Sequence, residues 1–284
     1  MMKRFMILLF LAFGVFSLTL MAQELENEVQ VSETPVAAKP YRIGVGLGGA
    51  FTGFREETDT PINRYVNALI YIIDGNIEKG SFLHSFYLDF YMGNAQVAKK
   101  YREFHQDYDY EFFRGRIEYA LDYRMWSILG DNKFPGFLGG MFRTDISYFS
   151  DNSGYMDSPK LSSLFSLGVH ATQKWIINPK NTLTLSAGIP LFTYAVRPAF
   201  AGMDDYWQKY AAEGSYAKFF GLGSFASIHN YWAIFSNVKY SYQFNSLLSF
   251  FGGLGFEFSH INVPKHRPRR DVAFLLNAGI SFTF

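Results

Sequence analysis

From Tyr41 to the end of the chain, hydrophobic residues alternate with small or polar residues in one segment after another. A period of two places the two sets on opposite faces of a β-strand, whereas a helix requires a period near 3.6. The last segment shows the pattern most clearly, and Leu275 is the only large hydrophobic residue on its second face. The first face carries Val272, Phe274, Leu276, Ala278, Ile280, Phe282 and Phe284. The sequence therefore predicts an all-β fold of amphipathic strands.

The segment from Glu111 to Trp126 combines an apolar face with a densely charged one. Its odd positions from Phe113 to Met125 are apolar or glycine. Its even positions include Arg114, Arg116, Glu118, Asp122 and Arg124. A soluble antiparallel sheet with its charged face in water would show the same alternation. The pattern alone therefore leaves both a soluble sandwich and a membrane barrel open.

Strand length and loop length favour the barrel. Many predicted strands run for about 12 to 17 residues, whereas globular strands cluster near 5 or 6 and a tilted membrane strand needs about 9 to 11. Long and short connections also alternate, as in barrels with short periplasmic turns and longer external loops. The exception is 127–136, which is long on the side where short turns are expected.

We predict a transmembrane antiparallel up-and-down β-barrel of about ten strands over residues 41–284. An even number of strands places both ends of the barrel on the same side of the membrane. Twelve strands are the alternative, because residues 212–225 could add another strand. In 65–74 both faces are apolar, so the inward face is not assigned. The predicted strands are 41–53, 65–74, 81–93, 110–126, 137–149, 161–177, 182–196, 226–244, 248–262 and 271–284.

The N-terminal residues carry a different pattern. A short basic start is followed by an almost wholly apolar run to Leu20, and Ala22 is a small residue suited to signal-peptidase cleavage. We expect residues 1–22 to be a cleaved signal peptide. A transmembrane anchor is the alternative, although no basic cluster follows the apolar run. Residues 23–40 are polar, acidic and proline-containing, which predicts a flexible periplasmic linker.

Composition narrows the classes of function. The chain has 26 basic and 25 acidic residues, so no charge surplus is available to bind nucleic acid. It has no cysteine, which excludes disulfides, thiolate metal sites and a cysteine nucleophile. The glycines at 44, 46, 48 and 49 are followed by no helix and do not form a dinucleotide motif. We predict that the protein uses no cofactor and no metal.

Export, amphipathic strands and a terminal Phe284, with Phe282 and Ile280 at the alternate positions before it, resemble Gram-negative outer-membrane β-barrel proteins. The resemblance covers about residues 41–284 and is to barrels of an uncharacterised family. It implies localisation in the outer membrane, with lipids and lipopolysaccharide as partners. It also implies that Ile280, Phe282 and Phe284 form the signal that the barrel-assembly machinery recognises. A surface or periplasmic protein partner is a further expectation.

Charged residues of both signs face inward on the predicted register. They include Arg114, Arg116, Glu118, Asp122, Arg124, Arg143, Asp145 and Lys174, together with Asp89, Lys239 and Glu257. The interior of a barrel of about ten strands is narrow and filled by side chains, so we expect these charges to pair into a polar plug. A narrow pore or a lumenal ligand site is the alternative. His170 is expected to be a hydrogen-bonded lumen residue.

Ser227 and His229 are the candidate catalytic pair, because they share the predicted inward face near the external rim. Such a pair could act as nucleophile and base in a hydrolase of lipid A or phospholipid. The Ser-x-His order is opposite to the His-x-Ser order of outer-membrane lipid hydrolases, and an inward pair faces away from lipid. We therefore predict a structural, assembly or interaction role through the external loops without catalysis. A lipid-modifying hydrolase and a small pore are the alternatives.

Overall fold

The computed structural model describes residues 41–56, 63–97, 110–127, 134–151, 160–197, 221, 223–263 and 268–284. The predicted signal peptide and linker lie outside these residues. The strands are β1 (Tyr41–Glu56), β2 (Arg64–Lys79), β3 (Phe82–Val97), β4 (Tyr110–Ser127), β5 (Pro135–Asp151), β6 (Lys160–Asn178), β7 (Asn181–Val196), β8 (Ser224–Ser227), β9 (Tyr231–Gln243), β10 (Leu248–Ile261) and β11 (Arg269–Thr283).

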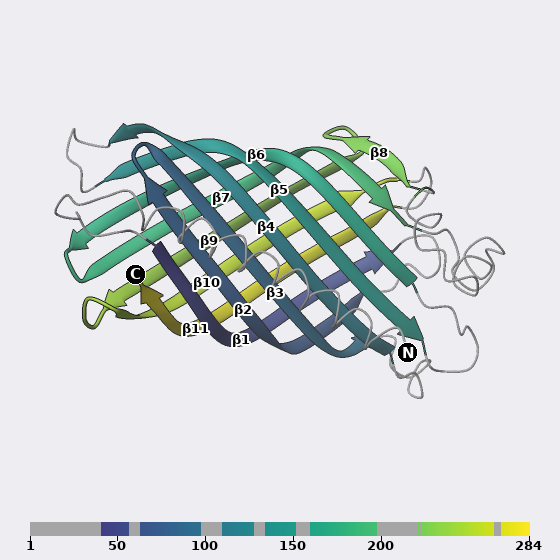
Figure 1. Ribbon diagram of the computed structural model, residues 1–284. Coiled ribbons are helices and arrows are strands. Elements are labelled where there is room, and N and C mark those ends of the chain that lie inside the picture. The colour runs from purple at the N-terminus through teal and green to yellow at the C-terminus, as the bar shows by residue number, and fades with distance from the viewer. Residues whose placement is uncertain are drawn as a thin grey trace. The chain divides into compact units, whose positions relative to one another are not determined.

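Ten of these strands form a closed antiparallel ring (Figure 1). The strands from β1 to β7 pair in chain order, each with its neighbour. Strand β7 then pairs with β9, β9 with β10, β10 with β11, and β11 with β1, which closes the ring. The short strand β8 pairs only with the last residues of β7. The predicted antiparallel barrel of ten strands is confirmed for the part of the chain that the structure describes.

The two ends of the barrel differ in their connections. Phe284 donates a backbone hydrogen bond of 2.9 Å to the carbonyl of Tyr41, so the first and last strands begin and end together. We call this end the terminal end. It also carries the short connections 80–81, 179–180 and 244–247, whereas the longest connections, 98–109 and 197–223, join strands at the opposite end. We call that opposite end the loop end.

No helix among the described residues is long and apolar enough to cross a membrane.

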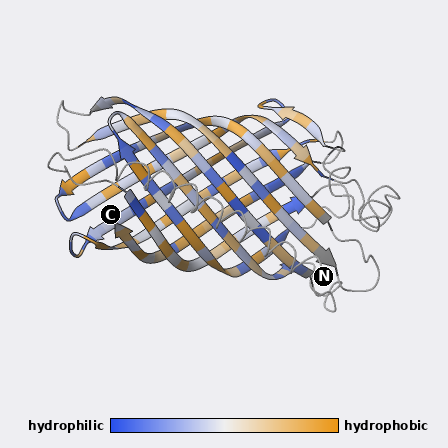
Figure 2. Ribbon diagram, viewed as in Figure 1, coloured by the Kyte–Doolittle hydropathy of each residue, from blue (hydrophilic) through white to orange (hydrophobic). Residues whose placement is uncertain are grey.

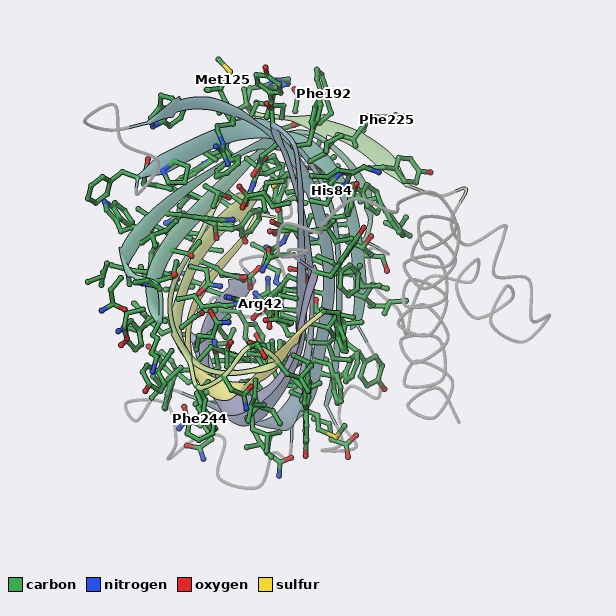
Figure 3. All side chains as sticks on the ribbon, turned by 60° about the vertical axis from the view of Figure 1, so that its left-hand side comes forward. Arg42, His84, Met125, Phe192, Phe225 and Phe244 are labelled. Atoms are coloured by element: carbon green, nitrogen blue, oxygen red, sulfur yellow. The ribbon has the colours of Figure 1, made fainter. Side chains whose placement is uncertain are left out.

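Side chains alternate between the two faces of the barrel wall as the sequence predicts. Figure 2 shows hydrophobic and polar residues alternating along the strands. On β10 and β11 the outward pair Leu254 and Leu276 is 60% and 56% exposed, while Asp89 and Arg116 on the inner face are 0% and 1% exposed. Figure 3 shows side chains projecting from both faces of the wall, among them Met125, Phe192, Phe225 and Phe244 on the outside. The barrel therefore presents an apolar surface outward and buries its charges.

The structure assigns the faces of β2, which the sequence left open. Val66 and Ile70 are fully buried in the lumen, and Leu69 between them is 52% exposed on the outside. Leu275 of β11, the exception in the pattern of the last strand, is 5% exposed and packs with these inward residues. Apolar residues stand on both faces here because this part of the lumen is itself apolar.

Several predicted boundaries differ from the observed ones, and two of the differences bear on the site. The expected turn at 75–80 lies instead at Gly80 and Ser81, where Gly80 has a φ of 60°. The strand was predicted to end at Asp74, but it continues to Lys79, and the carboxylate of Asp74 pairs with Lys239 in the lumen. The expected strand 226–244 is interrupted at 228–230, where a turn separates β8 from β9.

An outward arginine should destabilise the barrel according to its depth in the membrane. Leu276 lies in the middle of β11, so we expect Leu276→Arg to lower the free energy of unfolding by about 2 to 4 kcal/mol. Leu247 is 50% exposed at the terminal end, and Leu247→Arg should cost only about 0 to 1 kcal/mol. Urea unfolding in lipid vesicles measures both values. Equal costs at the two positions would mean that the apolar surface does not face a bilayer.

Candidate functional site

The centre of the lumen contains a network of ion pairs organised by one carboxylate, Glu257 of β10. Its oxygens lie 3.2 Å from Nη2 of Arg114 and 2.8 Å from Nη2 of Arg143, and they also pair with Arg116. Arg114 and Arg116 belong to β4 and Arg143 to β5, which stand across the ring from β10. The ion pairs of Glu257 therefore connect opposite walls of the barrel.

Each of these guanidinium groups also has a carboxylate partner on its own side of the lumen. Arg114 donates two hydrogen bonds from Nε to Asp145, at 3.0 and 3.1 Å, and a further one from Nη2. Arg116 forms a bidentate pair with Asp89. Arg143 donates to Glu118 at 2.9 Å. The network thus combines three cations with four carboxylates, a geometry in which charges can remain ionised inside a protein.

An apolar cluster lies in the lumen between this network and the loop end, next to an ion pair between Arg269 and Asp271. The ring of Phe54 stacks on Phe112 at a centroid distance of 5.2 Å and meets the edge of Phe149 at 5.5 Å. Within the cluster, the hydroxyl groups of Thr52 and Tyr91 form a hydrogen bond of 2.7 Å with each other. Its remaining members are Ala50, Val66, Ile70, Ile72, Ala95, Val97 and Leu275. A second group of buried residues, including Tyr231, Phe235 and Ile261, packs on the other side of the lumen.

A second set of polar contacts lies between the network and the terminal end. His170 Nδ1 is 2.7 Å from Asp122 Oδ2, and Thr172 donates to the same oxygen at 3.1 Å. Glu78 of β2 accepts from Arg124 at 2.5 Å and from Lys174 of β6 at 2.7 Å. Lys239 of β9 pairs with Asp74 of β2. As predicted from the sequence, His170 is buried and hydrogen-bonded.

These contacts surround a cavity of about 360 Å³. Its lining runs from Arg42 and Thr283, beside the terminal end, to Arg143 and Glu257 in the central network. Much of the wall consists of hydroxyl and amide side chains. They are Asn76, Ser85, Thr172, Thr182, Thr184, Ser186, Ser236, Asn237, Asn277 and Thr283. The cavity wall therefore combines hydroxyl, amide and charged groups with apolar side chains such as Leu83 and Phe86, and the ion-pair network bounds it on one side.

Phe251 of β10 lies over a patch of glycines in this wall. A methyl group at Gly46 would come within 2.9 Å of its ring, and one at Gly44 within 3.1 Å. Lys239 Nζ lies 5.0 Å from the centre of the same ring. The glycines near the start of β1 thus make room for an aromatic side chain inside the lumen.

Five of the eight lumenal charges that we expected to form a network meet in the central network, namely Arg114, Arg116, Glu118, Arg143 and Asp145. Arg124 and Lys174 instead share Glu78 in the second set of polar contacts, and Asp122 contacts His170 and Thr172. The structure adds Arg42, Asp74 and Glu78, which the sequence analysis missed. Asp74 and Glu78 share the inward face of β2 with Ile70, so the period of two contained the signal. These two residues were missed because the inward face of 65–74 was not assigned and because Glu78 fell in the predicted turn at 75–80.

Ser227 and His229 are close together, but the prediction that they face the lumen is wrong. Ser227 Oγ lies 2.7 Å from His229 Nδ1, and His229 is exposed. Ser227 pairs with Phe192, which is 64% exposed, whereas the neighbouring Ala226 is buried. The pair stands on the outer face because Ser227 ends β8 and His229 lies in the turn that follows.

That turn holds the two side chains in place. The backbone amide of Ser227 donates to Asn230 Oδ1 at 2.7 Å, and Asn230 donates back to the Ser227 carbonyl at 2.9 Å. Among the described residues, no carboxylate orients His229.

The expected assembly signal lies on the outer face of β11. Ile280 and Phe282 are 36% and 37% exposed, and Phe284 is 56% exposed at the terminal end. The described residues contain no group of three or more histidine, aspartate or glutamate side chains placed to bind a metal ion.

The sequence matches no protein-family model and no curated protein. Its fold matches solved structures. The outer-membrane protease OmpT from Escherichia coli is 8% identical, with a TM-score of 0.54, over 89% of this chain and 100% of OmpT. The translocator domain of NalP from Neisseria meningitidis is 10% identical with a TM-score of 0.45, over 96% of this chain and 97% of that domain. The protein thus has the fold of the Gram-negative outer-membrane β-barrels.

Removing the charge of Glu257 should cost more than removing that of Glu78. Glu257→Gln leaves buried guanidinium groups without their shared partner, and we expect a loss of about 3 to 5 kcal/mol of unfolding free energy. The Glu78 side chain is 25% exposed, so water can replace it and Glu78→Gln should cost about 1 kcal/mol or less. Chemical denaturation of the two variants provides the comparison. The network is not the main stabilising element if Glu257→Gln costs no more than Glu78→Gln.

Replacing Ser227 should leave cellular lipids unchanged, because its hydrogen bond to His229 belongs to a turn that lacks a described acid partner. The measurement is a mass spectrum of lipid A and phospholipids from cells with the wild-type protein, with Ser227→Ala and without the protein. A lipid species that is present only with the wild-type protein would contradict the prediction and identify an enzyme.

Proposed function

We propose that this barrel is an integral outer-membrane protein with a closed lumen, which acts through its external loops in a structural, assembly or interaction role. The observation that carries the proposal is the filling of the lumen. Ion pairs cross it at Glu257, and from there toward the loop end it contains the apolar cluster and the ion pair between Arg269 and Asp271. A barrel filled in this way provides no water-lined path for solutes.

The outer surface supports the membrane location. Large apolar side chains such as Leu47, Phe51 and Leu254 are 52% to 60% exposed on the barrel wall. A soluble protein would seldom expose a continuous apolar surface of this kind, whereas a bilayer would cover it. In this proposal, outer-membrane lipids and lipopolysaccharide are the partners of the wall.

The lengths of the connections between strands support an orientation with the terminal end in the periplasm and the loop end outside the cell. Outer-membrane barrels place short turns and both termini in the periplasm and long loops outside. In that orientation, the connections 98–109 and 197–223 would be external and available to a surface partner. The exposed Ile280, Phe282 and Phe284 would be the segment that the assembly machinery recognises.

A lipid-active hydrolase is the second candidate function. It is favoured by the 2.7 Å contact between Ser227 and His229, because the outward position of the pair would place it next to lipid. The lipid mass spectra of the Ser227→Ala variant decide between the two candidates.

A closed lumen should not conduct ions. We expect the purified protein to insert into planar lipid bilayers without producing stepwise current increments. An open porin, added under the same conditions, serves as the positive control for insertion and detection. Regular conductance steps that depend on the amount of protein would contradict closure and support the alternative of a small pore.

A further inference from the structure

The lumenal cavity carries a surplus of positive charge near the terminal end. Four cations line this part, namely Arg42, Arg124, Lys174 and Lys239. Only two carboxylates, Asp74 and Glu78, line it with them. Asp122, buried behind the lining residues His170 and Thr172, adds a third carboxylate to this region, so four cations face three carboxylates and one positive charge is left over.

The distribution of partners identifies the unbalanced groups. Lys239 forms an ion pair with Asp74, while Arg124 and Lys174 both pair with the carboxylate of Glu78. Arg42 is inside the barrel, as Figure 3 shows, and has no hydrogen bond or ion pair with any described residue. Its closest electrostatic partner, Asp74, is already paired with Lys239. Arg42 therefore presents an available guanidinium group to the cavity.

The opposite wall offers neutral hydrogen-bonding groups. Thr182, Thr184 and Ser186 alternate along the inner face of β7, and Asn237 of β9 lies beside Ser186. Asn237 Oδ1 is buried without a hydrogen-bond partner. Hydroxyl groups and amides at this spacing can donate to and accept from the hydroxyl groups of a ligand.

The dimensions of the cavity fit a small molecule. Its volume of about 360 Å³ falls within the range of roughly 300 to 1,000 Å³ that is typical of small-molecule sites. The apolar cluster blocks the route from the loop end, so a solute would enter beside Arg42 and Thr283.

We propose that the cavity binds a small polyhydroxylated organic anion, of the class of sugar phosphates and sugar acids, that enters from the terminal end. The anionic group lies against Arg42, with Lys174 and Lys239 contributing to the positive potential. The hydroxyl groups of the ligand contact the wall formed by Thr184 and Ser186. The site goes beyond the structural role proposed above and rests on it only for the side from which the ligand enters.

Calorimetric titration of the purified protein in detergent tests this site with glucose 6-phosphate, glucose and inorganic phosphate as probes. A phosphate monoester carries about −1.5 to −2 charges at pH 7 and can therefore pair with the guanidinium group of Arg42. We expect glucose 6-phosphate to bind more tightly than either glucose or phosphate, because only it engages both walls. Equal affinity for phosphate and glucose 6-phosphate would show that Thr184 and Ser186 do not contact the hydroxyl groups of the ligand, and would overturn that part of the proposal.

Single substitutions distinguish binding at the proposed site from a general attraction of anions to a positively charged protein. Arg42→Gln should weaken glucose 6-phosphate binding by about tenfold or more, and Arg42→Lys should retain part of it because the charge remains. Lys180→Gln removes an exposed cation that does not line the cavity and should leave binding unchanged. Unfolding curves of these variants should coincide with that of the wild type, since Arg42 forms no hydrogen bond or ion pair with a described residue.

The outcomes are distinct from those of the conductance experiment. Absence of measurable binding at millimolar probe concentrations, or equal affinity in the wild type and Arg42→Gln, would overturn the proposed site. Either result would leave the closed lumen intact. Conversely, conductance steps would overturn closure without changing the result of the titration.

Discussion

The contact of one carboxylate with three guanidinium groups is the interaction on which the interior of this barrel depends. Glu257 reaches from β10 to the opposite wall, where Arg114, Arg116 and Arg143 converge on it. Four strands of the ring separate β10 from β4 on either side, so no backbone hydrogen bond connects them. Because these groups are almost fully buried, each charge would be costly without its partner. The network therefore specifies the distance between the walls as well as the pairing within them.

The network also divides the lumen into two environments. Toward the loop end, Phe54, Phe112 and Phe149 pack as they would in a soluble core. Toward the terminal end, hydroxyl and charged side chains line a cavity. This asymmetry connects the two proposals. The apolar half supports a closed barrel, and the polar half supports a binding site that is accessible from one side only.

The sequence was sufficient to predict the wall of the barrel and most of the inward charges, because a period of two directly determines which face a residue occupies. It was not sufficient to identify partners across the lumen. Glu257 and Arg143 are paired by closure of the ring, and no local pattern encodes that distance. Asp74 was missed because both faces of 65–74 are apolar and the inward face was not assigned, and the pair that Asp74 forms with Lys239 depends on the tertiary structure. The orientation of Ser227 was wrong because the turn at 228–230 interrupts the alternation that was extended through it.

Labelling of single cysteines tests the central claim, closure of the lumen between its two ends, most directly. The chain contains no cysteine, so each introduced thiol is the only reactive one. Thr184→Cys places a thiol in the cavity, and Thr52→Cys places one among the buried residues toward the loop end. In proteoliposomes with a defined orientation, a small charged thiol reagent should modify Thr184→Cys only from the terminal side and leave Thr52→Cys unmodified from both sides. Modification of Thr184→Cys from the loop side would show an open path through the barrel and contradict closure.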